Sequence, residues 1–142
     1  MTINFQDLSD IEILDFVVRN SEAFAEDIDQ DFMKNAVLSV MVGDTVILRR
    51  REGFAITTVG RLFEKGWGQD PADIMFLYVQ EEYRGKGIGG DLIEHAKKAV
   101  SAGVSITALC EGALRARLFE QHGFSVTDTW DGSETRKLKY VP

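Results

Sequence analysis

The segment from Asp73 to Val79 constrains the fold more than any other part of the sequence. Its letters, DIMFLYV, form an almost continuous apolar run, which is typical of a strand buried on both faces of a sheet. A polar, glycine-rich loop follows, and the pattern from Ile88 to Ser101 then has helical spacing. Val104 to Leu109 is predicted to be the next strand. This order predicts a crossover connection, which places the two strands parallel in one sheet.

The rest of the chain predicts helices and strands around this crossover. Ser9 and Glu12 have the spacing of a capping box ahead of a first helix. The apolar rows that begin at Phe32 and Met33 predict a second helix ending at Gly43, although Ala36 to Val42 also fits a strand. The remaining expected elements are strands at Thr2–Phe5, Thr45–Arg50, Phe54–Phe63, Phe124–Trp130 and Thr135–Val141, and a helix at Ala113–Gln121. The order is β, α, α, β, β, β, α, β, α, β, β, an α+β class with a mixed, mostly antiparallel sheet flanked by helices.

A single domain over residues 1–142 is expected, because no repeat or Pro/Ser-rich linker interrupts the chain. The net charge of -7 argues against broad binding to nucleic acid or to an anionic membrane. We see no signal peptide at the N-terminus and no apolar stretch near the ~20 residues that span a bilayer. The one cysteine, Cys110, excludes an internal disulfide and fits a reducing compartment. We therefore expect a cytoplasmic protein, and a homodimer is compatible with the sequence.

The loop from Arg84 to Gly90, RGKGIGG, has the composition of a phosphate-binding loop. Glycines let the backbone approach a ligand closely. Amides at the start of a helix point toward one spot and carry the positive end of the helix dipole. Arg84 and Lys86 add positive charge. A turn that only reverses the chain is the alternative, but such a turn rarely needs four glycines and two cations ahead of a helix.

Two phosphate-binding motifs fit these letters, and the first is the dinucleotide fingerprint G-x-G-x-x-G. Gly85, Gly87 and Gly90 match it, and Glu111 lies where a ribose-binding acid belongs. The five polar residues between Val79 and Gly85 weaken this interpretation, because the fingerprint normally follows its strand at once. Too little chain remains after Glu111 for a second nucleotide-binding half. No lysine followed by Ser or Thr stands in the loop, which excludes a Walker motif.

The second motif is Arg-x-x-Gly-x-Gly, formed by Arg84, Gly87 and Gly89. The stretch Leu77–Gly89, LYVQEEYRGKGIG, resembles the signature L-x-V-x-P-x-x-R-G-x-G-I/L-G of the GNAT superfamily of N-acetyltransferases. Ala113–Phe124, ALRARLFEQHGF, is similar to the segment of that family that ends in Y-E-x-x-G-F. The resemblance implies a GNAT-like fold and an acetyl-CoA-dependent N-acetyltransferase. Such an enzyme transfers an acetyl group to a primary amine by direct attack in a ternary complex, with acetyl-CoA as cosubstrate and no metal.

The resemblance also implies which residues bind the cofactor. The main chain of the strand would bind the pantetheine arm, and an amide there would polarise the thioester carbonyl. The loop amides would bind the diphosphate. The expected cofactor contacts are Leu77, Tyr78, Val79, Arg84, Gly85, Lys86, Gly87, Ile88, Gly89, Gly90, Gly112 and Phe119. Gly112 stands where the family often has asparagine, and Phe119 stands where it often has tyrosine.

Transfer to an amine calls for a base, because an ammonium group of pKa near 10.4 costs about 4–5 kcal/mol to deprotonate at pH 7. Asp73 is the first candidate, since histone-type members of the family resemble it with a glutamate at the matching place. Glu111 is the second candidate. The alternative for Asp73 is an exposed residue at the start of a strand, and the alternative for Glu111 is a carboxylate at a helix N-terminus. Phe119 cannot protonate the departing thiolate, as the family's tyrosine often does. This substitution leaves open a catalytically impaired CoA-binding sensor or interaction module with the same fold.

The acceptor is expected to be a small-molecule amine or a protein amine. Five carboxylates lie within ten residues that contain no Lys or Arg, and they could attract a cationic acceptor or simply solubilise a loop: Glu22, Glu26, Asp27, Asp29 and Asp31. Phe24, Phe63 and Trp67 are candidates for the acceptor wall, with core or rim packing as the alternative. His95 and His122 are expected to be a helix-surface and a helix-end residue, and no cluster has the spacing of metal ligands.

Overall fold

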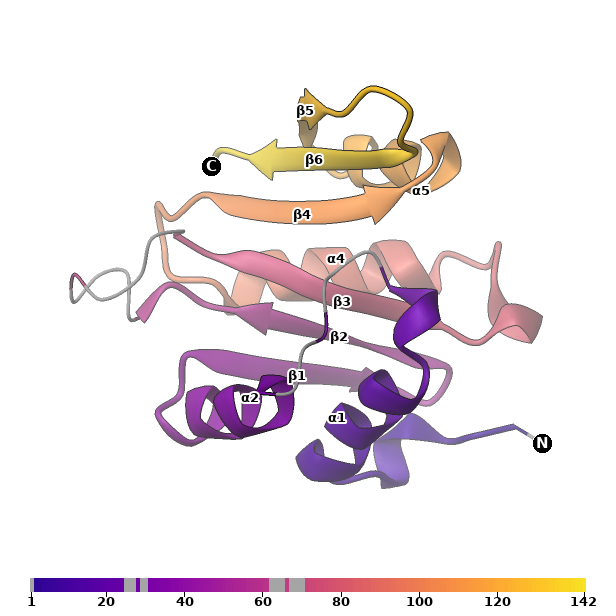
Figure 1. Cartoon of the computed structure of the whole chain (residues 1–142), viewed down its shortest axis with the longest axis vertical. Helices are drawn as coiled ribbons and strands as arrows, with labels where there is room; N and C mark the ends of the chain where they lie inside the picture. The colour runs from indigo at the N-terminus through magenta and orange to yellow at the C-terminus, as the bar shows by residue number, and fades with distance from the viewer. Residues whose placement is uncertain (1, 25–27, 29–30, 62–65, 67–70) are drawn as a thin grey trace.

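The computed structural model describes residues 2–24, 28, 31–61, 66 and 71–142 (Figure 1). Within them, one six-stranded sheet has the order β1-β2-β3-β4-β6-β5. Every neighbouring pair is antiparallel except β3 and β4, which are parallel. The predicted α+β class and the predicted crossover are therefore confirmed. The helices are α1 (Asp10–Arg19), α2 (Phe32–Met41), α4 (Ile88–Ala99) and α5 (Ala113–Glu120); the strands are β1 (Thr45–Arg50), β2 (Gly53–Thr58), β3 (Asp73–Val79), β4 (Ile106–Glu111), β5 (Ser125–Thr129) and β6 (Thr135–Tyr140); the short 3-10 helices are η1 (Phe5–Asp7), η2 (Ser21–Ala23) and η3 (Glu81–Tyr83).

The strand predicted at Thr2–Phe5 is wrong. The N–H of Ile3 donates to Gln80 Oε1 at 3.0 Å, and Gln80 Nε2 donates to the carbonyl of Ile3 at 2.6 Å. The N–H of Phe5 donates to the carbonyl of Arg51 at 3.2 Å. The buried side-chain amide of Gln80 thus takes the bonds that a neighbouring strand would have taken, and the chain turns into η1. From α1 onward the predicted order of elements is confirmed.

Two further predictions are refined by the structure. The stretch that fitted either a helix or a strand is helical through Met41, and Gly43 follows it with a left-handed φ of 79°. The second hairpin strand ends at Thr58 rather than continuing to Phe63, which lies outside the described residues.

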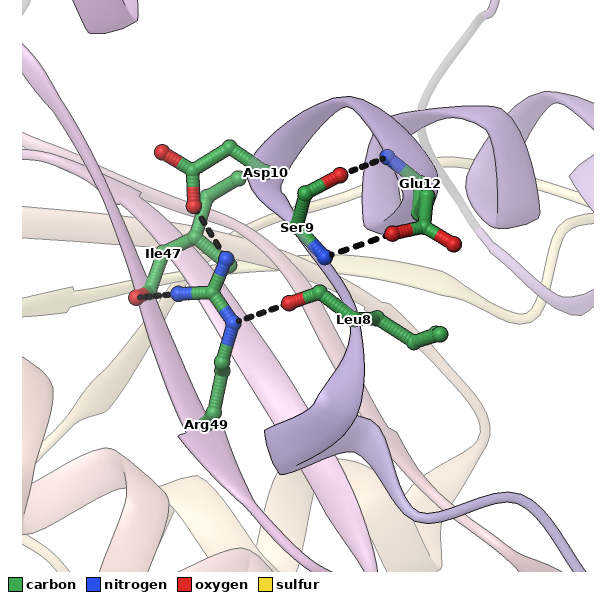
Figure 2. A network of polar contacts seen from close by, with 6 residues as sticks. All are labelled: Leu8, Ser9, Asp10, Glu12, Ile47 and Arg49. Atoms are coloured by element: carbon green, nitrogen blue, oxygen red, sulfur yellow. Dashed lines mark hydrogen bonds and ion pairs between the residues drawn. The ribbon is translucent and has the colours of Figure 1, made fainter.

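The capping box predicted for α1 is present (Figure 2). Ser9 Oγ accepts the N–H of Glu12 at 3.2 Å, and the N–H of Ser9 donates to Glu12 Oε1 at 3.0 Å. This bond lowers the pKa of the Glu12 carboxyl. Arg49 on β1 donates to the carbonyl of Leu8 at 3.0 Å and pairs with Asp10. These bonds fix the start of α1 against the sheet.

Helices cover both faces of the sheet (Figure 1), and an apolar core lies on each face. On one face, α1 and α2 pack with residues such as Phe5 and Phe76. On the other face, α4 and α5 pack with residues such as Leu92 and Ile74. Strand β3 contributes side chains to both cores, so the continuous apolar run that begins at Asp73 follows from burial on both faces.

Candidate active site

Strands β3 and β4 pair at two positions and then separate. Asp73 faces Thr107 and Ile74 faces Ala108 in the parallel ladder, although β3 continues to Val79. Figure 1 shows the gap between the two strands widening toward the C-terminal end of β3. The far part of β3 therefore has an edge that β4 does not cover.

A β-bulge at Met75 lies where this separation begins. Ile74 and Phe76 face consecutive residues of β2, so Met75 has no opposite residue in that ladder. The bulge places two successive side chains, Met75 and Phe76, on the face covered by α1 and α2. Ile74 and Leu77 lie on the face covered by α4. The bulge thus re-aims the strand next to the gap.

The main chain of Leu77 and Val79 faces the gap. The N–H of Gln80 donates to the carbonyl of Glu52, in the turn between β1 and β2, at 3.0 Å. Gln80 and Tyr78 therefore direct their backbone groups toward β2. Alternate residues of a strand direct these groups to opposite edges, so Leu77 and Val79 point the other way. Consistent with this, the carbonyl of Val79 accepts Arg84 Nε at 2.9 Å.

Helix α4 begins directly after the glycine loop. Its N-cap is Gly87, its first turn carries Asp91, and Lys97 and Lys98 lie in its last turn, where they complement the helix dipole. Its apolar residues face the sheet, and Leu92 is fully buried. The first turn of α4 is therefore held beside the open edge of β3.

Gly85 and Gly87 give the loop its shape. Their φ angles are 77° and 84°, which L-residues with a side chain rarely adopt. A Cβ at either position would meet no atom of the described residues within 4 Å. Both glycines therefore border open space at the N-terminus of α4.

Gly89 and Gly90 serve a different purpose, which is the packing of α5 on α4. A Cβ at Gly89 would lie 3.1 Å from Leu118 Cδ2, and one at Gly90 would lie 2.6 Å from His122 Nε2. These two glycines let the neighbouring helix and its last turn approach closely.

A cavity of about 320 Å³ lies at the gap, between β3, β4, the glycine loop and α5. Most of its lining is apolar, and among the described lining residues Arg84 and Arg115 carry charge. The predicted cofactor contacts that line it are Leu77, Tyr78, Val79, Arg84, Gly85, Gly87, Ile88, Gly89, Gly90 and Phe119. Lys86 and Gly112 do not line it; the Lys86 ammonium lies 5.7 Å from the centroid of the Tyr83 ring instead.

The acetyltransferase (GNAT) domain model matches residues 42–126, which is more than half of the chain. The chain belongs to the GNAT acetyltransferase family. Solved structures of this fold resemble it over nearly the whole length. PaiA N-acetyltransferase from Thermoplasma acidophilum, in complex with coenzyme A, has 18% identity and a TM-score of 0.61, with 98% of this chain and 84% of that chain covered.

Two further GNAT-fold structures are similar. Naa50 from Arabidopsis thaliana, in complex with the bisubstrate analogue CoA-Ac-MVNAL, has 15% identity and a TM-score of 0.64, with 95% of each chain covered. The ribosomal-protein-S18-alanine N-acetyltransferase from Escherichia coli has 20% identity and a TM-score of 0.61, with 94% of this chain and 90% of that chain covered. No protein with curated annotation matches the sequence. At these identities the structural likeness shows the fold alone.

In this GNAT domain, Asp73 lies at the paired end of β3, outside the cavity lining. Thr107 Oγ1 donates to Asp73 Oδ1 at 2.7 Å, and the N–H of Asp73 donates to Thr58 Oγ1 at 2.8 Å. Because Ile74 packs toward α4, the carboxylate of Asp73 lies on the opposite face, the one that carries Met75. The half-buried carboxylate is therefore held firmly close to the bulge.

The second candidate base and the two described carboxylates of the acidic cluster, Glu22 and Asp31, do not line the cavity. Glu111 is exposed at the end of β4 and does not line the cavity. Glu22 is exposed in η2 and does not line it either. Glu26, Asp27 and Asp29 lie outside the described residues, as does Trp67 of the predicted acceptor wall.

Phe24 lines the cavity and also packs against the core on the face covered by α1 and α2. Its ring packs edge-on against Phe76, with the centroids 5.0 Å apart. Leu114, Leu118 and Arg115 on α5 also line the cavity, although they were not predicted from the sequence. The spacing offers one signal for Arg115, because it lies four residues before Phe119 on the same helix face.

The Cys110 thiol lines the cavity but is nearly inaccessible, at 4% exposure. Burial raises the pKa of this thiol, against the opposing effects of Arg136 and Arg115. The neutral thiol is a poor nucleophile, so the chemistry of the site does not depend on Cys110 as an acyl carrier. Among the described residues, no three or more His, Cys, Asp or Glu side chains are grouped so as to hold a metal ion. Nor is any helix in that part of the chain long and apolar enough to cross a membrane.

Proposed function

We propose that this protein is an acetyl-CoA-dependent N-acetyltransferase that binds its cosubstrate between β3 and β4. The main support is the separation of the two strands, which turns the main chain of Leu77 and Val79 toward the cavity. An extended pantetheine arm pairs with such an edge as an added strand would. The coenzyme A complex of the Thermoplasma enzyme and the CoA-Ac-MVNAL complex of Naa50 support this choice of cosubstrate.

The diphosphate binds at the N-terminus of α4. Gly85 and Gly87 border open space there, so the loop amides can approach phosphate oxygens without a side chain in the way. Arg84 ties the loop to the end of β3 through its bond to Val79, and its charge favours an anion. Lys86 adds positive charge without lining the cavity. The residues present therefore fit the cosubstrate.

The amine nitrogen attacks the thioester carbonyl directly in the ternary complex. A C–N bond forms, the C–S bond breaks, and coenzyme A leaves as the thiolate. A main-chain N–H on the open edge of β3 stabilises the negative charge that develops on the carbonyl oxygen. Before the attack, the ammonium gives one proton to Asp73, two residues before the bulge at Met75, through an intervening water. The second proton leaves the nitrogen as the C–S bond breaks and passes to solvent.

The departing thiolate takes its proton from solvent. Phe119 lines the cavity at 4% exposure and has no proton to donate. A thiol of pKa about 8.5 lies only about 1.5 units above neutrality, so release as the thiolate costs roughly 2 kcal/mol. The absence of a tyrosine at this position therefore adds only a small energetic barrier to catalysis.

The amine enters from the face covered by α1 and α2. Phe24 and Met75 line the cavity on that face, which suits the apolar part of an acceptor. The acceptor is a primary amine of a small molecule or of a protein. The protein alternative is supported by the Escherichia coli enzyme named for an alanine of ribosomal protein S18 and by the analogue bound to Naa50.

Two measurements test this proposal. Thermal unfolding with acetyl-CoA, coenzyme A and NADH should show stabilisation by the first two alone; stabilisation by NADH alone would exclude the proposal. Release of free thiol should then be followed with a panel of polyamines, aminoglycosides, lysine peptides and peptides with free N-termini. Phe119 favours one second candidate, a coenzyme A sensor. That candidate predicts stabilisation by acetyl-CoA with no thiol release from any amine.

A further inference from the structure

His122, which lies outside the cavity lining, packs directly against the first turn of α4. It follows the end of α5, and its ring nitrogen Nε2 would lie only 2.6 Å from a Cβ added at Gly90. The ring carbon Cε1 would lie 3.1 Å from the same Cβ. Gly90 itself is buried and lines the cavity. The edge of the imidazole therefore rests on bare backbone, one turn or less from Gly87.

The other edge of the ring is tied to the same helix. His122 Nδ1 lies 2.7 Å from Glu94 Oε2, and Glu94 follows Gly90 by one helical turn. The ring thus spans one turn of α4, with one edge on Gly90 and the other at Glu94. The hydrogen bond from His122 is the largest influence on the Glu94 carboxyl, and it lowers the pKa of that group; Lys97 acts in the same direction, and partial burial opposes both.

Lys97 closes this cluster. Its Nζ lies 3.1 Å from Glu94 Oε2 and donates to the carbonyl of His122 at 2.9 Å. The same ammonium lies 4.3 Å from the centroid of the Tyr140 ring on β6. Both the ring and the backbone of His122 are therefore held, so the imidazole cannot swing away from Gly90 without breaking bonds to Glu94 or Lys97.

The cluster joins two walls of the cavity. One wall is the first turn of α4, which carries the proposed diphosphate site. The other is α5, which contributes Arg115, Leu118 and Phe119 to the lining. The distance between these walls depends on how closely the end of α5 approaches Gly90.

We infer that His122 is a positioning residue for the cosubstrate: seated on Gly90 and bound to Glu94, it sets the spacing between α4 and α5 and with it the affinity for acetyl-CoA. This inference rests on the proposed function. Any side chain at position 90 pushes α5 outward. This explains why Gly90 is a glycine although its φ is in the ordinary helical range, unlike those of Gly85 and Gly87.

A paired substitution tests the contact. Gly90→Ala places a methyl group against the imidazole. His122→Asn keeps an amide near the position of Nδ1 for Glu94 but removes the ring edge that rests on Gly90. For Gly90→Ala we expect the KM and Kd for acetyl-CoA to rise ~10-fold with kcat changed less than about 3-fold, and we expect the double variant to regain most of that loss. His95→Asn, an exposed histidine on the same helix, is the matched control and should bind as the wild type does.

The outcomes separate the two proposals. Affinity is measured by calorimetric titration with acetyl-CoA, which does not depend on turnover. A wild-type protein that fails to bind acetyl-CoA contradicts the proposed function itself. If the wild type binds, the positioning role is overturned by a double variant that binds no better than Gly90→Ala, or by a Gly90→Ala variant with unchanged Kd. If Gly90→Ala does not fold, restoration of folding and binding by His122→Asn supports the contact, and failure to restore them contradicts it.

Discussion

The two ends of β3 serve the site in different ways. At the paired end, three threonine hydroxyls bond to the carboxylate, N–H and carbonyl of Asp73, so a side chain is held in place by the surrounding strands. At the open end, Leu77 and Val79 turn main-chain groups toward the cavity. The bulge at Met75 marks the boundary between them. A single strand can thus hold a side chain in place where its ladder is intact and offer its backbone where the ladder is open.

The paired end is tested most strongly by Asp73→Asn. If Asp73 accepts the proton of the amine, we expect kcat to fall ~10²–10³-fold, while the KM for acetyl-CoA stays nearly constant. The loss should shrink as pH rises toward the pKa of the free amine, about 10, because more of the acceptor is then already neutral. Rates with one amine from pH 6 to 10 check both points. The control is Glu111→Gln, the exposed carboxylate at the end of β4, which should retain wild-type rates. Wild-type rates in Asp73→Asn together with a large loss of kcat in Glu111→Gln would identify Glu111 as the base instead.

The glycine loop beside the open end of β3 is tested by Gly87→Ala. Alanine at a φ of 84° is strained by roughly 1–2 kcal/mol, and its methyl group enters the space proposed for the diphosphate. We expect the Kd for acetyl-CoA to rise ~10–30-fold, as measured by calorimetry. Gly103→Ala is a matched control, since Gly103 has a φ of 80° and open space but lies at the far end of α4. It should lose similar stability and no affinity. Equal affinity losses in both variants would show that strain, and not the ligand site, is responsible.

The contrast between the two ends of β3 was only partly predictable from the sequence. The strand, the loop and the helix after it follow from hydrophobic spacing and glycine positions. The bulge at Met75 does not, because every residue from Ile74 to Val79 is apolar or aromatic and a change of face leaves no mark in such a run. The error at Thr2–Phe5 has a similar origin, since the side-chain amide that replaces a strand partner lies on Gln80, far along the chain.

The separate roles of the glycines in the loop were also not predictable from the sequence. Gly85, Gly87, Gly89 and Gly90 look alike in sequence, and Gly90 even completes a dinucleotide fingerprint. In the structure, Gly85 and Gly87 border open space, whereas Gly89 and Gly90 allow α5 and the residue after it to approach closely. This division depends on where Leu118 and His122 lie, which is a tertiary contact that no local pattern encodes.

A smaller effect is expected across the gap, at Phe119. Phe119→Tyr places a hydroxyl at the cavity, where it can protonate the departing thiolate. Because release as the thiolate costs roughly 2 kcal/mol, we expect kcat to rise by at most ~30-fold, with little change in Tm. Phe124→Tyr is the control, because that ring packs on Phe119 at 5.3 Å but does not line the cavity. It should lower Tm without raising kcat. An unchanged kcat in Phe119→Tyr would mean that a step other than thiolate release limits the rate.

The smallest effect is expected at Thr107, and it tests whether the hydrogen bond from this residue orients the carboxylate of Asp73. Thr107→Val removes the hydroxyl that bonds to Asp73 Oδ1 while keeping the shape of the side chain. The carboxylate then gains rotational freedom but is still present, so kcat should fall only ~3–10-fold, which is close to the net contribution of a typical intramolecular hydrogen bond. Thr45→Val serves as the control, because its hydroxyl bonds to Ser39 away from the cavity, and its loss should lower Tm and leave kcat unchanged. In an Asp73→Asn background, Thr107→Val should cause no further loss of kcat, since there is no longer a base to orient. An additive loss in that double variant would assign Thr107 a role independent of Asp73.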